Sequence, residues 1–241
     1  LMENGRLPNM QRVMQNGCYG TIHSIRAPGD KHYRPQTAWP TLATSVSPED
    51  HGITRYWHTN EELNVETIWE VFQRNGHRVG LFGWPMTWPP NETNGFVIPC
   101  HHARDTKTWP PELSIIKDLD QRQKKIEREE GFSKRLAEGI RSAIFLTKYG
   151  LKVTTLWKLI GLFINYIVAT DFEKRALLLR YAKLELNLDI FLNLYKHCPP
   201  AFCNFTSFLV DLVSHRYWRY YEPDKFGEID QDVIDLYGGA L

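Results

Sequence analysis

Three features that would place this chain in a specialised class are missing from its 241 residues. The charge is balanced, with 29 Lys and Arg against 28 Asp and Glu, so nothing favours a nucleic-acid duplex as a partner. The four cysteines form no C-x-x-C pair and no zinc-finger spacing, so no disulfide framework is implied. The opening residues, Leu1-Met2-Glu3-Asn4-Gly5, lack the apolar run of a signal peptide.

The chain also lacks a hydrophobic run long enough to cross a bilayer. Its longest apolar stretch, residues 159–169, is too short for a span and contains Asn165. Lys152 and Lys158 flank this stretch at helical spacing. We therefore expect no transmembrane segment but a buried or partner-facing helix, with a helix in the membrane interface as the alternative.

What the chain does have is enough apolar material for one core, with 42% hydrophobic and 13% aromatic residues. Residues 65–75 predict an amphipathic helix closed by Gly76, and residues 78–82 predict a short apolar strand. Helix, glycine turn and strand at this spacing indicate an α/β fold, an α/β/α sandwich with a mainly parallel sheet. Before them, residues 7–16, 18–25 and 38–44 predict a helix, a strand and a short helix.

The pattern changes over residues 112–198, where a charged helix is expected at 118–130 and a Leu-rich helix at 172–195. We expect a helical insertion that caps the core, lies outside the sheet and contributes no metal ligand. Residues 1–111 would then form the first part of the α/β core. Residues 199–241 would continue it, with a strand over 201–209. Because no strand precedes the first helix, we expect an internal fragment of a longer protein.

Thr37 is the first candidate for chemistry, because it directly precedes the short helix expected from Ala38. An N-cap there would expose its hydroxyl beside free backbone N–H groups, which favour an anion such as phosphate. A hydroxyl whose pKa is lowered by a metal can attack phosphorus. A purely structural cap is the alternative interpretation. Thr41, one turn later, is the second candidate nucleophile.

Asp211 and His215 are the candidate metal ligands. They stand four residues apart, so on a helix they share a face, and they follow the strand expected at 201–209. A carboxylate oxygen and an imidazole nitrogen suit zinc or another first-row divalent ion. The alternative is a chance pair without a metal.

Other histidines receive structural interpretations. His51 lies in a tight turn before Gly52, where a structural hydrogen bond is more common than metal binding. Cys100-His101-His102 is interpreted as a solvated loop, because adjacent side chains on an extended segment diverge.

Several of these segments together resemble the type I phosphodiesterase/nucleotide pyrophosphatase family of the alkaline phosphatase superfamily. The segments are Leu7-Pro8-Asn9-Met10, residues 37–44, Pro48-Glu49-Asp50-His51-Gly52-Ile53, residues 67–85, and Asp211-x-x-x-His215 with Trp218 and Pro223. The resemblance implies an alkaline phosphatase-like fold, two divalent metal ions (zinc), and a Thr or Ser nucleophile that forms a phospho-enzyme. By position it implies that Thr37 is the nucleophile and a metal ligand, and that Asp211 and His215 bind one metal.

The sequence departs from the family pattern in three ways. Thr44-Ser45 stands where the family has Thr-Gly, and the spacing from the nucleophile to this pair is shorter. The family's first Asp ligand, its later Ser-Asp-His-Gly segment and its final His have no counterpart in residues 1–241. We therefore expect the 241-residue chain alone to be feeble or inactive, since two-metal catalysis needs both ions.

The resemblance predicts a metal-dependent phosphoric-ester hydrolase of the phosphodiesterase or nucleotide pyrophosphatase type. Its substrate would be a phosphoester or nucleotide-like small molecule. One alternative is a phosphomonoesterase or sulfatase-like enzyme of the same superfamily. The other is a non-catalytic binding module that keeps the fold.

Overall fold

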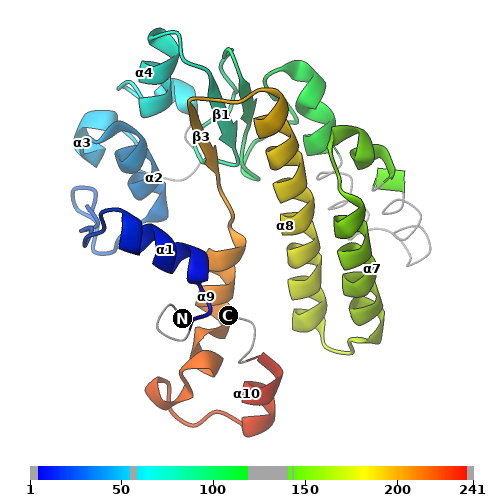
Figure 1. Cartoon of the computed structure of the whole chain (residues 1–241). Helices are drawn as coiled ribbons and strands as arrows, with labels where there is room; N and C mark the ends of the chain where they lie inside the picture. Colours follow the sequence, from blue (N-terminus) through cyan, green and yellow to red (C-terminus); the bar gives the residue numbers. More distant parts are fainter. Residues whose placement is uncertain (1–4, 55–58, 119–140, 143, 238–241) are drawn as a thin grey trace.

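Three short parallel strands form the centre of the fold (Figure 1). The computed structural model of the chain describes residues 5–54, 59–118, 141–142 and 144–237. The strand order is β2-β1-β3, where β1 is Val79–Phe82, β2 is Phe96–Ile98 and β3 is Phe202–Phe205. Leu81 of β1 is in register with Val97 on one side and Asn204 on the other. Because both pairs are parallel, the carboxyl ends of all three strands lie at the same edge of the sheet.

Helices cover both faces of this sheet, so the core has three layers. Alternate side chains of a strand point to opposite faces, and each face here has its own buried cluster. The cluster on the side of α2 (Pro35–Thr44) and α4 (Ile68–Arg74) contains Ala43, Trp69, Val79, Leu81 and Val97. The cluster on the side of α8 (Phe172–His197) contains Phe82, Phe96, Ile98, Leu113, Ile116, Leu146, Leu151 and Ile190. The α/β fold with a parallel sheet is therefore confirmed.

The helices before and beside β1 begin at recognisable signals. They are α1 (Pro8–Asn16), α2 (Pro35–Thr44), α3 (Pro48–His51), the 3-10 turn η1 (Asn60–Glu62) and α4 (Ile68–Arg74). Proline opens α1, α2 and α3, because the first helical position needs no N–H donor. Thr67 and Glu70 form a reciprocal capping box at the start of α4.

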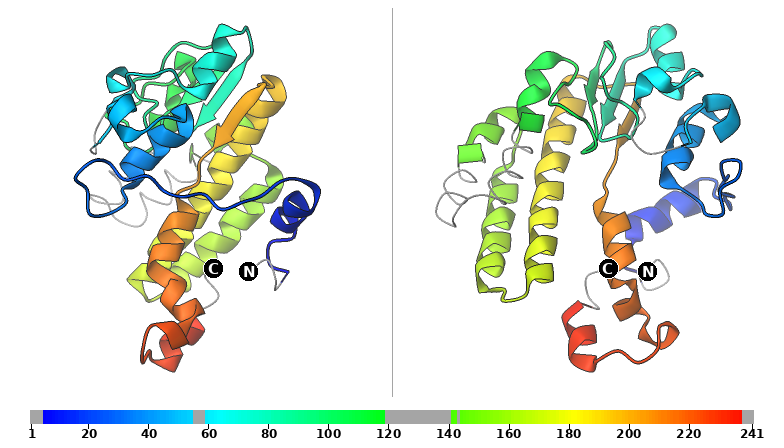
Figure 2. Two further views of the ribbon diagram at one scale, coloured as in Figure 1. Left: turned by 90° about the vertical axis from the view of Figure 1, so that its left-hand side faces the viewer. Right: turned by 180° about the vertical axis from the view of Figure 1, so that it is seen from behind.

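The second half of the chain is mostly helical. It contains η2 (Pro111–Leu113), η3 (Thr147–Tyr149), α7 (Val153–Val168), α8 (Phe172–His197), α9 (Leu209–Tyr221), η4 (Pro223–Lys225) and α10 (Gln231–Tyr237). α7 and α8 lie side by side as a hairpin (Figures 1 and 2). The buried carboxylate of Asp189 on α8 accepts the Lys152 N–H at the start of α7, at 2.9 Å. None of the helices in the described ranges could span a membrane.

Several boundaries differ from the sequence-based prediction. Residues 18–25 form no strand; they are exposed and no neighbouring strand pairs with them. The strand expected over 201–209 stops at Phe205, because α9 already begins at Leu209. The helix expected from Ala38 begins at Pro35. The three-residue strand β2 was not predicted, and it is too short to leave a periodic signal.

The expected insertion is closer to the sheet than a separate cap. Ile190 of α8 is 2% exposed and belongs to the cluster that covers one face of the sheet. The helix predicted over 172–195 is confirmed as α8, and it forms one layer of the core. The charged helix predicted over 118–130 lies, after residue 118, outside the described residues. The domain boundaries at 111 and 198 stay predictions.

Candidate functional site

Helix α2 carries the two candidate hydroxyls. Arg34 is its N-cap, so Thr37 is the third helical residue and not the cap. The Thr37 side chain is fully buried, and its hydroxyl donates to the Arg34 carbonyl oxygen at 2.9 Å. The prediction of an exposed N-cap hydroxyl is therefore wrong. Pro35 explains the difference, because its fixed φ suits the first helical position and moves the start of the helix upstream.

Thr41 takes part in a hydrogen-bond chain that joins α2 to α3. Its hydroxyl donates to the Thr37 carbonyl oxygen at 2.8 Å and lies 3.1 Å from His51 Nε2. His51 Nδ1 accepts the N–H of Ile53 at 3.1 Å. A ring nitrogen that accepts an N–H carries no proton, so we assign the proton to Nε2, which donates to Thr41.

This arrangement defines the role of His51. Burial lowers its pKa, which keeps the ring neutral. Since Nε2 already holds a proton, the imidazole is not set up to remove one from Thr41. His51 instead positions α2 against α3, and its interpretation as a structural histidine is confirmed.

Asp211 and His215 lie one turn apart on α9. Asp211 Oδ1 and His215 Nε2 are 3.3 Å apart, so the prediction that the pair shares a helix face is confirmed. The side chains are 66% and 79% exposed, so both can be reached from solvent. An oxygen and a nitrogen donor on one face fit half of a tetrahedral zinc site. Among the described residues, no cluster of three or more His, Cys, Asp or Glu side chains could hold a metal ion.

An aromatic contact brings α2 next to the start of α9. Trp39 lies on α2 between Thr37 and Thr41, and its ring centroid is 6.3 Å from that of Phe208, three residues before Asp211. Trp39 also packs edge-on against Trp84, which follows β1, at 5.0 Å. The helix of the candidate hydroxyls therefore contacts the residue that precedes α9, at the carboxyl edge of the sheet, where open α/β sheets bind their ligands.

The segment after β2 reaches the same edge. The ring of His101 lies 4.6 Å from Phe208 and 4.0 Å from the ring of His102. The expectation that these two histidines diverge is wrong, because they lie in a turn and not in an extended segment. The sequence indicated an aromatic loop at Trp84, directly after the first strand, but not that His101 and Phe208 lie beside each other at the same edge. The only signal of this contact was that aromatic or histidine side chains follow each of the three strands.

A buried lysine holds this turn in place through the backbone that leads into it. Lys117 is 6% exposed, and its Nζ donates to the carbonyl oxygens of residues 99 and 100 at 3.2 and 2.8 Å. Burial raises the pKa of the neighbouring Cys100 thiol, so the thiol stays protonated and is a poor metal ligand. The turn thus presents its histidines, and not its cysteine, at the edge of the sheet.

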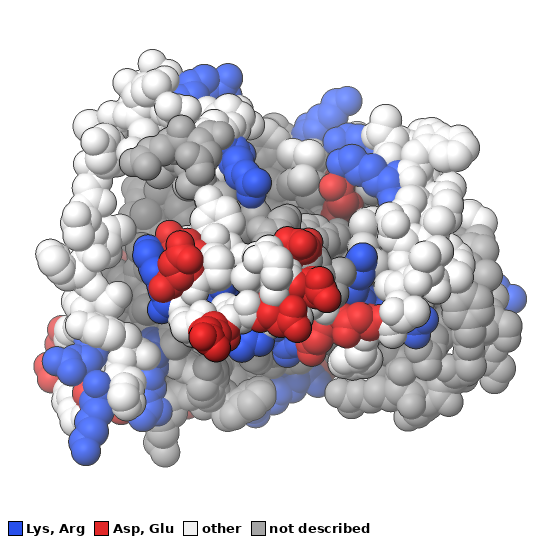
Figure 3. All heavy atoms as spheres, turned by 90° about the horizontal axis from the view of Figure 1, so that it is seen from below, with Lys and Arg blue, Asp and Glu red and all other residues white. Residues whose placement is uncertain are grey.

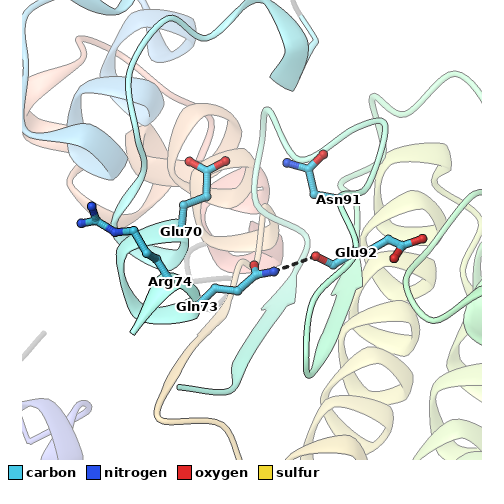
Figure 4. A pocket seen from close by; sticks show the side chains of 5 residues that line it. All are labelled: Glu70, Gln73, Arg74, Asn91 and Glu92. Atoms are coloured by element: carbon cyan, nitrogen blue, oxygen red, sulfur yellow. Dashed lines mark hydrogen bonds between the residues drawn. The ribbon is translucent and has the colours of Figure 1, made fainter. Parts of the chain in front are cut away.

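Two other surface features suit an anionic ester less well. Figure 4 shows a shallow groove between α4 and the segment before β2, in which the charged ends of Arg74 and Glu92 point away from each other.

Figure 3 shows acidic side chains gathered at the end of the molecule that carries α10. The exposed acidic residues of that segment are Asp224, Glu228, Asp230, Asp232 and Asp235. Negative charge of this density repels a phosphate.

A family model described as type I phosphodiesterase / nucleotide pyrophosphatase matches residues 1–239. The chain belongs to that family. No curated protein and no solved structure matches it significantly. The match spans both sequence motifs, Thr37 to Ile53 and Asp211 to His215. Type I phosphodiesterases and nucleotide pyrophosphatases are hydrolases that act on phosphoester and nucleotide substrates, so membership places the chain in a hydrolase family.

Proposed function

We propose that this type I phosphodiesterase chain carries part of a metal-dependent site that cleaves phosphodiester or pyrophosphate bonds with a hydroxyl of α2 as nucleophile. The observation that supports the proposal most is the contact between Trp39 and Phe208. It joins the helix of the candidate hydroxyls to the N-cap of the helix that carries the candidate ligands, at the edge of the sheet expected to bind substrate. The family match gives the reaction class.

Asp211 and His215 are the proposed ligands of one divalent ion, zinc, and Thr37 is proposed to contact metal as well. A bound ion of this kind lowers the pKa of a hydroxyl and stabilises negative charge on phosphoryl oxygens. The family resemblance implies a second ion, and its remaining ligands are not assigned to residues of this chain. The exposed side chains of Asp211 and His215 can bind without a change in the fold.

Thr37 is the proposed nucleophile. A threonine hydroxyl is barely ionised at neutral pH, so it must lose its proton before it attacks phosphorus. In the structure this proton is donated to the Arg34 carbonyl oxygen, and the side chain is buried. The proposal therefore includes an opening at the first turn of α2, in which the Thr37 hydroxyl leaves Arg34 and faces the substrate.

Thr41 is the rival nucleophile, and one observation favours it. It is half-buried where Thr37 is fully buried, so a substrate can approach it more easily. Its hydroxyl is also held, between His51 Nε2 and the Thr37 carbonyl oxygen. Either residue would displace the alcohol or nucleotide and form a phospho-threonine, which water then hydrolyses.

The test is turnover of bis-p-nitrophenyl phosphate by the natural protein with added zinc. Thr37→Ala should lower kcat by at least about 10³-fold, since loss of a nucleophile removes the covalent route. Thr44→Ala is the matched control, because this threonine lies on the same helix and its hydroxyl also donates to a carbonyl oxygen, that of Pro40. If Thr41→Ala loses activity and Thr37→Ala does not, Thr41 is the nucleophile. Full activity in both variants would remove α2 as the source of the nucleophile.

Two further comparisons separate the remaining alternatives. Parallel assays with a phosphate monoester and a sulfate ester distinguish a diesterase from a phosphomonoesterase or a sulfatase. The 241-residue chain, assayed beside the natural protein, should turn over the diester feebly or not at all. A natural protein that binds zinc and phosphate but cleaves none of these esters would instead be a binding module.

A further inference from the structure

One face of α7 exposes a continuous row of large apolar side chains. Between a third and three-quarters of each of them is accessible: Val153 68%, Trp157 69%, Ile160 48%, Ile164 56%, Ile167 49% and Val168 73%. The first five are spaced alternately four and three residues apart, and Val168 follows Ile164 by four, so the six form one seam along the helix. Scattered exposed apolar residues are normal, but a seam of six marks a contact surface.

Gly161 lies in the middle of this seam, one turn after Trp157 and just before Ile164. Glycine weakens a helix interior relative to alanine, so a packing reason is expected for it. No such reason exists within the described chain, because a Cβ at Gly161 would meet nothing within 4 Å. A small residue at the centre of an apolar seam lets a second helix approach closely.

The charges around the seam suit a helix better than a lipid surface. Lys158 is the only charged residue of α7, and its Nζ is 2.9 Å from Glu185 on α8. Lys152 is paired with Asp189 at 3.2 Å. A helix that binds a membrane surface normally presents free cations beside its apolar face. The nearby amide of Asn165 donates to the Gly161 carbonyl oxygen at 3.0 Å, so an apolar partner would not leave it unpaired.

We propose that this seam binds the same seam of a second copy of the chain, with the two α7 helices antiparallel. A seam without charge is complementary to itself, and a two-fold axis beside Ile160 and Gly161 places Trp157 against Ile164 of the other copy. Trp157 then meets the smaller Ile164, Ile160 meets Gly161, and the two helix dipoles oppose each other. The proposal is independent of the catalytic function.

The size of the seam fits a reversible dimer. If Trp157 contributes on the order of 150 Å² and each aliphatic side chain about 70 Å², the pair buries roughly 1,000 Å² in total. Specific interfaces begin near this size, so we expect a Kd on the order of 10 µM.

Sedimentation equilibrium of the 241-residue chain between about 1 and 100 µM tests the proposal, because a Kd in this range gives a measurable monomer–dimer equilibrium. Ile164→Glu should raise the Kd at least tenfold. Gly161→Leu should do the same although it adds apolar surface, because it blocks the close approach. Ile22→Glu is the control: Ile22 is 85% exposed but lies outside α7, so the Kd should not change. A wild-type chain that stays monomeric at 100 µM would overturn the proposal.

Two further measurements address orientation and the lipid alternative. In a Cys18→Ser background, Ile160→Cys should form an inter-chain disulfide on oxidation. Trp157→Cys should not, because in the antiparallel pair its two copies are offset by roughly 10 Å, beyond disulfide reach. Cross-linking of both variants would contradict the antiparallel arrangement. Binding of Gly161→Leu to phosphatidylserine-containing vesicles, without dimers of the wild type, would assign the seam to a lipid surface instead.

Discussion

The two halves of the candidate site are built in opposite ways. On α2 and α3, the polar side chains of Thr37, Thr41 and His51 are hydrogen-bonded inside the protein, and two of the three are fully buried. At the start of α9, Asp211 and His215 touch each other and are otherwise open to solvent. Folding alone therefore fixes the side that bears the hydroxyls. The side of the proposed ligands is left open to solvent, as binding of an ion would require.

This difference predicts a large loss of stability when the buried half is changed. His51→Ala removes the acceptor for the Ile53 N–H and the donor to Thr41, and it leaves a cavity. We expect the free energy of unfolding to fall by about 2–4 kcal/mol, measured by urea denaturation. His23→Ala is the control, because His23 is exposed and should change stability by less than about 0.5 kcal/mol. Equal effects of the two variants would contradict the contrast between the halves.

A smaller effect should appear with pH. Burial lowers the pKa of His51 in the folded protein, so the unfolded chain binds a proton first as the pH falls. The contribution of His51 to stability is present above its unfolded pKa of about 6.5 and is lost as the pH falls toward the folded pKa. The urea midpoint should therefore decrease as the pH falls from 7.5 to 5. Most carboxylates have pKa values below this range and stay ionised in it.

His51→Asn sharpens this test. The asparagine Oδ1 can still accept the Ile53 N–H, but it does not titrate. The variant should be less stable than the wild type at pH 7.5 and should lose less stability on acidification. A variant with the same pH slope as the wild type would show that another group causes the dependence.

Local signals in the sequence predicted much of the architecture. The run 78–82 predicted β1, Gly76 marked the end of α4, and Pro8 marked the start of α1. The spacing of Asp211 and His215 predicted their shared face, because it depends only on helix geometry. Each of these features is decided by residues close together in the chain.

What the sequence could not show depends on distant partners. Residues 18–25 have strand-like composition but form no strand, since a strand needs a neighbour to complete its hydrogen bonds. The burial of Thr37 and the bond between Thr41 and His51 result from packing of α2 on α3 and α4. The contact of Trp39 with Phe208 joins residues that are far apart in the chain, and no local pattern predicts it.

The smallest effect on stability is expected in the open half of the site. Asp211→Ala removes one member of an exposed pair at i,i+4 spacing, and such pairs contribute about 0.3–0.5 kcal/mol. The free energy of unfolding in the presence of a metal chelator should therefore change by no more than this. A loss comparable to that of His51→Ala would show that the pair is structural.

Zinc binding to the natural protein, followed by isothermal titration calorimetry, tests the central claim most directly. Asp211→Ala and His215→Ala should each weaken zinc binding at least tenfold, since even residues that only support metal ligands affect affinity by about 10–100-fold. Their unfolding free energies in chelator should stay at the wild-type value within about 0.5 kcal/mol. Wild-type zinc affinity in both variants would contradict the account, because the exposed pair on α9 would then not be the ligand half of the site.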